Sequence, residues 1–282
     1  MSARSGVLRF QFSRMLRSKA WRYALVVGLV VSAVCFAQTC LLFWGHDIGE
    51  VPSADVAWVG NYESMQTPLF TLYLVFLMPF LSAAVFGDSL FNDVRRRFAA
   101  CVVSRSSLRA YVASGAVAAS VGGFLVVLVP LAVSQLLAFV AFPVAAGQDV
   151  FQLFVNTSAA TADVTAWYRQ TLFPGLFLNH RYLLNVLFIV YDALWGGLLA
   201  LASFVLSLYL RVSRLLVVGV PALALIVSTY LMPTDFNVAR DLMLSLVMPR
   251  NPVFFALAPV AVGALLVAAA AFALRSGRDV LL

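Results

Sequence analysis

Six long apolar stretches constrain this chain more than any other feature of its sequence. They cover residues 23–43, 69–86, 111–142, 183–210, 215–232 and 253–274. Each is close to or above the roughly 20 apolar residues that a helix needs to cross a bilayer. Only 11% of the 282 residues are charged, which is too few to cover a soluble protein of this size and argues against soluble enzymes and nucleic-acid-binding domains. We therefore expect an all-α, polytopic membrane protein with six transmembrane helices.

The basic residues predict how these spans are oriented. Of the 19 basic residues, fifteen lie before span one, between spans two and three, between spans four and five, or after span six. The segment 45–67 holds four acidic residues and no basic one. Because Lys and Arg are enriched in cytoplasmic loops, both termini are expected in the cytosol. The predicted location is the cell (inner or cytoplasmic) membrane, with several passes.

Residues 1–22 are predicted to form a leader that precedes a transmembrane domain of residues 23–282. One face of a helix over 5–22 would carry apolar side chains and the other basic ones: Leu8, Phe12, Met15 and Leu16 against Arg14 and Arg17. Such an amphipathic helix lies in the membrane interface, where its arginines meet anionic lipid. The alternative is a disordered basic tail. Span one is too long for the apolar region of a signal peptide and is expected to be retained.

Two outer segments and one inner loop have further predicted features. Aromatic residues in 143–180 favour a position along the outer membrane interface, and residues 234–251 are predicted to form a short amphipathic helix that dips into the outer leaflet. In the inner loop 87–110, Ser104 or Ser106 is expected to cap a helix that continues into span three. The loop itself is either a topology anchor or a docking surface for a cytosolic partner.

Asp192 lies near the middle of span four, where a charged group costs at least ~2.5–3.5 kcal/mol. It is either a gate or substrate contact, or a carboxyl that hydrogen-bonds a neighbouring helix through Tyr191, Ser120 or Ser134. Small residues at helical spacing predict close helix packing, within the chain or partly between subunits. These residues are Gly115, Ala119 and Gly123 in span three, and Ala193 and Gly197 in span four.

The residue patterns that several kinds of functional site require are absent from the sequence. The only lysine, Lys19, stands in Arg-Ser-Lys-Ala, so the chain has no phosphate-binding P-loop. The three cysteines and two histidines have neither disulfide nor metal-site spacing. The spans hold no histidine and one aspartate, which argues against a membrane-embedded enzyme. No catalytic, cofactor or metal residue is therefore predicted.

The loop after span two resembles that of the membrane permease subunits of ABC-2 type exporters. The matching order is an aromatic–acidic turn, a charged stretch, a Ser-Arg pair and a tyrosine that enters span three: Phe86, Asp88, Asp93, Arg95, Ser104, Arg105 and Tyr111. A second match is the tight return over residues 207–214, followed by Pro221 within span five. The six spans, cytosolic termini and basic leader agree with the same family.

This resemblance implies an exporter subunit that dimerises, as a homodimer or with a paralogous permease, and works with a separate P-loop ATPase subunit. The ATP and Mg²⁺ would bind that partner. The loop between spans two and three would be the coupling element, with Asp88, Asp93, Arg95, Arg96, Arg97, Arg105 and Arg109 as the candidate contacts. The apolar spans favour an amphipathic or lipid-like cargo, membrane lipid as a neighbour and no nucleic acid. The alternatives are a proton-coupled secondary transporter that uses Asp192, and a regulatory membrane subunit.

Overall fold

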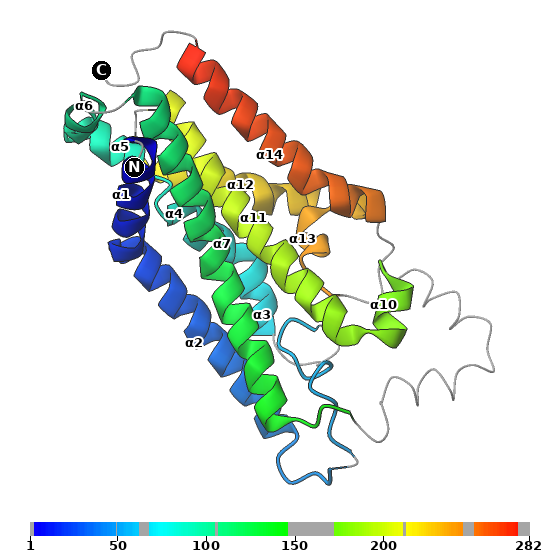
Figure 1. The fold of residues 1–282 in the computed structure, drawn as a ribbon. Coiled ribbons are helices and arrows are strands. Elements are labelled where there is room, and N and C mark those ends of the chain that lie inside the picture. The colour runs from blue at the N-terminus through cyan, green and yellow to red at the C-terminus, as the bar shows by residue number, and fades with distance from the viewer. Residues whose placement is uncertain are drawn as a thin grey trace.

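The computed structural model describes residues 3–48, 50–61, 68–104, 107–145, 172–210, 213–244 and 251–275. This part of the chain is helical, with one isolated β-bridge between Asn61 and Leu244. Six of its helical stretches are long and apolar enough to cross a membrane. Ala3 at the start of α1 and Arg275 at the end of α14 lie at the same end of the bundle (Figure 1). The fold is that of a multi-pass helical membrane protein.

The six spans match the expected apolar stretches to within a few residues at most ends. They are α2 (Lys19–Leu42), the segment Pro68–Arg95, α7 (Leu108–Ala141), α11 (Arg181–Tyr209), α12 (Arg214–Leu231) and α14 (Pro252–Arg275). The segment Pro68–Arg95 consists of α3 (Pro68–Leu72), η2 (Tyr73–Leu77), α4 (Met78–Ala84) and α5 (Ser89–Arg95). Short elements complete the fold: α1 (Ala3–Arg17), α6 (Phe98–Val103), α10 (Pro174–Asn179), η3 (Thr234–Phe236) and α13 (Val238–Asp241).

Helices α7 and α11 form the centre of the bundle, and they cross at closely packed glycines. A Cβ atom added to Gly123 would lie 2.4 Å from the carbonyl oxygen of Gly196. Only residues without a side chain allow two helix backbones to approach this closely. Helix α2 packs on one side of this pair and α14 on the other (Figure 1). Most of the apolar surface of α14 is exposed.

The leader differs from its expected form. Helix α1 ends at Arg17 rather than at residue 22, because the Ser18 side chain accepts a hydrogen bond from the Trp21 backbone N–H and starts α2 at Lys19. One face of α1 packs on protein: Met15 is fully buried, and its sulfur lies near the position a Cβ on Gly122 of α7 would occupy. The leader is therefore held at least partly by the bundle itself.

The second span contains a π-helical turn, η2, that the apolar pattern did not predict. The Met78 N–H donates to the carbonyl of Tyr73, five residues earlier. Pro79 follows directly and has no N–H to continue the α-helical ladder. A π-turn beside a proline is a common way to accommodate such a missing bond.

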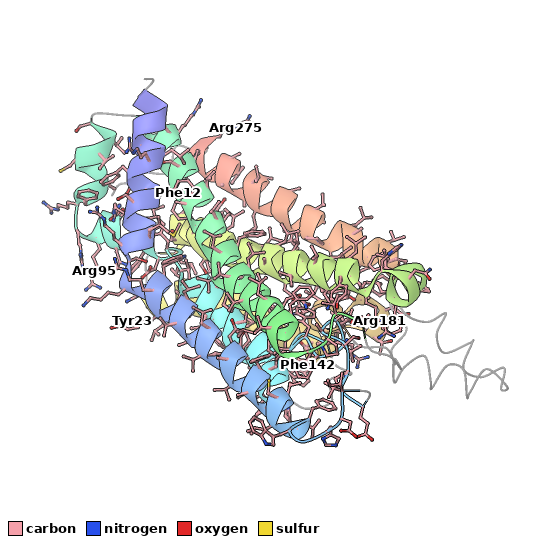
Figure 2. All side chains as sticks on the ribbon, turned by 60° about the horizontal axis from the view of Figure 1, so that its bottom comes forward. Phe12, Tyr23, Arg95, Phe142, Arg181 and Arg275 are labelled. Atoms are coloured by element: carbon pink, nitrogen blue, oxygen red, sulfur yellow. The ribbon has the colours of Figure 1, made fainter. Side chains whose placement is uncertain are left out.

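Residues 50–61 do not lie outside the bundle as a simple acidic loop. Ala54, Ala57, Trp58 and Val59 are all buried, and Trp58 is 1% exposed. We call residues 50–61 the inserted segment. It fills the end of the bundle where α7 ends and α11 begins, which Phe142 and Arg181 mark in Figure 2. We call this the far end, and the opposite end, which carries α1, α5 and α6, the arginine end.

The two segments that are expected on the outer side are only partly described. Residues 146–171 and 245–250, which include much of the expected interfacial segment 143–180 and the end of 234–251, lie outside the described residues. Within the second segment, α13 has four residues, begins at an Asn237 cap and buries Leu242. The repeat of apolar residues predicted a longer helix within 234–251. The regular helix ends at Asp241, because the chain turns there.

Candidate functional site at the arginine end

The loop between α4 and α7 begins with a forced turn against α11. Phe86 has a positive φ of 56°, which L-residues rarely adopt. A Cβ on the adjacent Gly87 would lie 2.5 Å from the Ala83 carbonyl oxygen and 2.5 Å from Ser203 Cβ. Glycine is therefore required for the chain to turn so close to α11. The turn directs α5 and then α6 across the arginine end.

Asp93 of α5 joins three helices. Arg14 of α1 donates two hydrogen bonds to its carboxylate, from Nη1 to Oδ2 at 2.8 Å and from Nη2 to Oδ1 at 2.7 Å. The Tyr111 hydroxyl of α7 donates a third to Oδ2. Asp93 is 4% exposed, and bidentate pairs of this kind are the strongest charge-assisted hydrogen bonds in proteins. The carboxylate thus fixes α5 to both α1 and α7.

Arg14 occupies a partly buried position within aromatic side chains. Its guanidinium lies 5.1 Å from the ring centroid of Phe98, 5.5 Å from that of Phe10 and 5.8 Å from that of Phe86. Burial alone would lower the pKa of Arg14, but the hydrogen bonds and charge of Asp93 outweigh it and raise the pKa above its usual value. The expectation that Arg14 faces anionic lipid is wrong, because its guanidinium turns inward to Asp93.

Asp88 joins the start of the loop to span five. Its carboxylate forms an ion pair with Arg214, the first residue of α12, and accepts a hydrogen bond of 2.9 Å from Asn92 Nδ2. Asp88 is buried, whereas the Arg214 side chain is 59% exposed. Asp88 and Asp93 together attach the loop to helices α1, α7 and α12.

The arginines of the loop lie on its outer surface. Arg95, Arg96, Arg97 and Arg109 are exposed, and Arg97 has a φ of 58° at the turn between α5 and α6. Arg105 lies outside the described residues. The candidate contacts thus divide into two groups: inward carboxylates that hold the loop and outward guanidinium groups that are accessible to a partner. Figure 2 shows Arg95 well apart from Arg275, which lies at the same end on α14.

The cap of α7 differs from the expected one. Ser107 accepts a hydrogen bond of 3.2 Å from the Ala110 N–H, whereas the Ser104 hydroxyl donates to the Cys101 carbonyl. Ser106 lies outside the described residues. The cap stands one residue later than the latest position expected, and α7 begins at Leu108 and continues as span three.

Asp192 lies away from the loop, in the middle of α11, and is 2% exposed. It interacts electrostatically with Tyr73 in the π-turn η2. Of the hydrogen-bond partners considered from the sequence, Ser134 accepts a hydrogen bond from Trp58 Nε1 at 3.0 Å, and the Tyr191 ring stacks on Phe255 at 3.7 Å between centroids. The π-turn that brings Tyr73 to this position leaves no signal in the apolar pattern.

The small residues in spans three and four lie where α7 and α11 pack together. Gly115 faces the ring of Phe204, with 2.6 Å between its added Cβ and Cζ, and Gly197 faces the Ser120 carbonyl oxygen at 3.0 Å. Ala119 and Ala193 are fully buried. These residues set the distance between α7 and α11.

An apolar groove of about 630 Å³ lies beside this helix pair. Its walls come from α7, α11 and α14 and include Phe124, Leu198, Phe255 and Pro259. Within the described ranges no three His, Cys, Asp or Glu side chains come together in a way that could hold a metal ion. The groove thus offers a hydrocarbon surface rather than a polar or metal-binding pocket.

Sequence reasoning named both carboxylates of the site but did not pair them with their arginines. Arg14 was placed on the basic face of the leader and Arg214 was read only as a topology signal, and nothing in the spacing pairs residue 14 with residue 93 or residue 88 with residue 214. One signal in the sequence could have pointed to these ion pairs. Asp88 and Asp93 are rare acidic residues at a strongly basic end, so each is expected to pair with a basic residue. No protein-family model, curated protein or solved structure matches this chain.

Proposed function

We propose that this chain is the membrane-spanning permease subunit of an ABC-2 type exporter, driven by a separate P-loop ATPase that binds the arginine end from the cytosol. The observation that carries the proposal is the attachment of the loop at Asp93. A loop that transmits movement from a partner to membrane helices has to be fixed to those helices. Asp93 supplies this by binding α1 and α7 at once.

The two groups of loop residues take different roles in this proposal. Arg95, Arg96, Arg97 and Arg109 are exposed and make the contact with an acidic surface of the ATPase. Arg105 belongs to the same candidate group by sequence. Asp88 and Asp93 position the loop and touch no partner, because both are buried. ATP and Mg²⁺ bind in the partner, since this chain has no P-loop lysine.

The cargo is proposed to be amphipathic or lipid-like. The groove between α7, α11 and α14 has a volume typical of small-molecule sites, about 630 Å³, and mostly apolar walls. The exposed apolar faces of α2, α12 and α14 supply the surface for membrane lipid and for a second permease copy or a paralogue. The resulting complex would reside in the cell membrane.

A binding experiment tests the coupling role directly. The solubilised wild-type chain is expected to co-purify with a P-loop ATPase, and the triple variant R95A/R96A/R97A to lose it. R275A is the matched control, because Arg275 is also exposed and lies at the same end but away from the loop. Each variant is first checked for wild-type thermal stability, which exposed arginines leave nearly unchanged.

Three results would contradict the proposal. One is that no ATPase accompanies the wild-type chain. Another is that the triple variant retains the ATPase as well as R275A does. The third is transport that continues without ATP and stops when the proton gradient is removed, which would support a secondary transporter that uses Asp192.

A further inference from the structure

Three basic residues surround the corner between α1 and α2. Arg17 is the last residue of α1, Ser18 forms the corner, and Lys19 is the first residue of α2. Arg22 lies one turn into α2, and its Nε donates a hydrogen bond of 3.4 Å to the Leu16 carbonyl on the other side of the corner. Arg17, Lys19 and Arg22 are all exposed. We call these three residues the basic corner.

The basic corner lacks the acidic partners that two other arginines of this end have. Arg14, one turn earlier on α1, binds Asp93, and Arg214 binds Asp88. In the part of the chain that the structure describes, no carboxylate forms an ion pair with a residue of the basic corner. The corner therefore presents three positive charges that the described residues do not neutralise.

The lengths of α2 and α7 place the basic corner at the depth of a membrane interface. The two helices pack side by side where Gly28 meets Pro130. From there α2 runs back nine residues to Lys19, whereas α7 runs back 22 residues to Leu108. Helix α7 therefore extends about 20 Å beyond the start of α2. The 24 residues of α2 measure about 36 Å, so they cross a hydrocarbon core of about 30 Å and leave the first turn at the headgroups.

An exposed apolar stripe continues from the basic corner along α2 (Figure 2 labels Tyr23 at its start). Positions i, i+3, i+4, i+7 and i+11 share one face of this helix: Lys19, Arg22, Tyr23, Val26 and Val30. Tyr23 is 68% exposed, Val26 54% and Val30 55%. The face thus presents two cations, then an aromatic ring of the kind favoured at membrane interfaces, and then hydrocarbon.

We propose that the basic corner and this stripe of α2 together bind one anionic phospholipid. The phosphate contacts the basic corner, and an acyl chain lies along Val26 and Val30. Arginine suits this role because its guanidinium group can donate two parallel hydrogen bonds to a phosphate. The contact with the Leu16 carbonyl uses one of the five N–H donors of Arg22 and leaves four.

The charge and the stripe together favour a lipid over other anions. A free phosphate ion matches the three cations but gains nothing from the stripe. An acidic protein surface does not continue along a helix face inside the bilayer. Binding at the corner also fixes α1, the helix whose Arg14 holds the loop through Asp93. The inference requires neither an ATPase nor a cargo, so it stands or fails independently of the proposed exporter function.

Native mass spectrometry of the detergent-solubilised chain tests the charge requirement. The wild-type chain is expected to bind phosphatidylglycerol at least about tenfold more tightly than phosphatidylcholine, because each basic residue near an anionic lipid strengthens binding about fivefold. The variant R17Q/K19Q/R22Q is expected to bind both lipids equally. Equal binding of both lipids by the wild-type chain, or an unchanged preference in the triple variant, would overturn the proposal.

Single substitutions separate the basic corner from an ordinary basic residue at a helix end. R22Q is expected to weaken phosphatidylglycerol binding about fivefold. R275Q is the matched control and is expected to leave binding unchanged, because Arg275 is also exposed and ends an exposed span. An equal loss in the two variants would overturn the proposal. Displacement of the lipid by an excess of inorganic phosphate would also overturn it, because the site would then bind free anions.

Photo-crosslinking in lipid nanodiscs applies to the unmodified chain, so it does not depend on any variant folding. The probe is phosphatidylglycerol with a photoreactive group on its acyl chain, present as a minor component in phosphatidylcholine. It is expected to label the α2 peptide with Val26 and Val30 about fivefold more than the α14 peptide with Val267 and Phe272. The α14 peptide is the internal control, since Val267 is 62% and Phe272 63% exposed at the same end. Equal labelling of the two peptides would contradict a lipid site on α2.

Discussion

The two ends of the bundle are both closed by short non-spanning segments, but the bonds that hold these segments differ in kind. At the arginine end, charged partners hold the loop: Arg14 binds Asp93 and Arg214 binds Asp88. At the far end, neutral groups hold the inserted segment. Asn185 Nδ2 donates to the Asp55 carbonyl and to Gln135 Oε1, both at 2.9 Å, and Trp58 donates to Ser134.

This difference bears on which end responds to a partner. Ion pairs near a surface weaken with salt and with the approach of other charges, whereas buried amide networks do not. An acidic partner surface of the kind proposed would therefore act on the arginine end and leave the far end in place. The far end requires loss of a buried hydrogen bond before it opens.

The largest expected effect comes from removing the charge that joins three helices. In D93N the Arg14 guanidinium loses its counter-ion in a half-buried site, which is expected to destabilise the protein by about 3 kcal/mol. Thermal unfolding of the detergent-solubilised chain measures this change. D47N, at an exposed aspartate, is the control and is expected to stay within about 0.5 kcal/mol of wild type. If D93N unfolds like D47N, Asp93 does not hold the loop.

The far end is tested by N185A, which removes both amide donations while Asn185 is buried. The Asp55 carbonyl and Gln135 Oε1 are then left without this donor, at an expected cost of about 2 kcal/mol. Because the network is neutral, the cost is expected to be equal in 0.05 M and 0.5 M NaCl. N179A, at an exposed position on α10, is the control. A cost that falls with salt would remove the proposed contrast between the two ends.

The two ends also differ in how much of their structure the sequence predicted. The six spans followed from apolar length alone, because a bilayer imposes its thickness on every helix that crosses it. Asp88 and Asp93 stood out as acidic residues in a basic loop. Their arginine partners did not, because pairing over 79 residues depends on where α1 lies against α7.

The far end was harder to predict for a different reason. The segment 45–67 reads as an acidic outer loop, and hydropathy treats asparagine, glutamine and a single tryptophan there as ordinary loop residues. The inserted segment is held in the bundle because Trp58 donates to Ser134 and the amides of Gln135 and Asn185 donate to the Ala54 and Asp55 carbonyls. The π-turn at Tyr73 escaped prediction similarly, since its cause is the missing N–H of Pro79 rather than any change in polarity.

A smaller effect is expected when Arg14 is replaced by lysine, which keeps the positive charge but cannot make two parallel hydrogen bonds to Asp93. R14K retains one contact with Asp93 and is expected to cost about 1 kcal/mol. Because the pKa of Arg14 is raised, its pair with Asp93 contributes fully below the ordinary arginine pKa and is lost only as pH rises through the higher folded value. Wild type thus keeps this contribution from pH 7 to pH 10. R14K is expected to lose stability near pH 10, where lysine titrates; a curve parallel to that of wild type would contradict the assignment.

The smallest effect is expected at Arg214, although its carboxylate partner is as deeply placed as Asp93. R214Q removes an ion pair whose basic side chain is 59% exposed, and pairs in such positions contribute about 0–1 kcal/mol. Asp88 also keeps the hydrogen bond from Asn92. We therefore expect a loss near 0.5 kcal/mol in low salt that vanishes above about 0.5 M NaCl, because exposed charges are screened there. The effect of D93N, measured in the same series, is also expected to fall with salt but to stay larger than that of R214Q, because Asp93 is 4% exposed. If R214Q costs as much as D93N at both salt concentrations, α12 holds the loop as firmly as α1 does, and a partner that engages the arginines would have to move three helices rather than two.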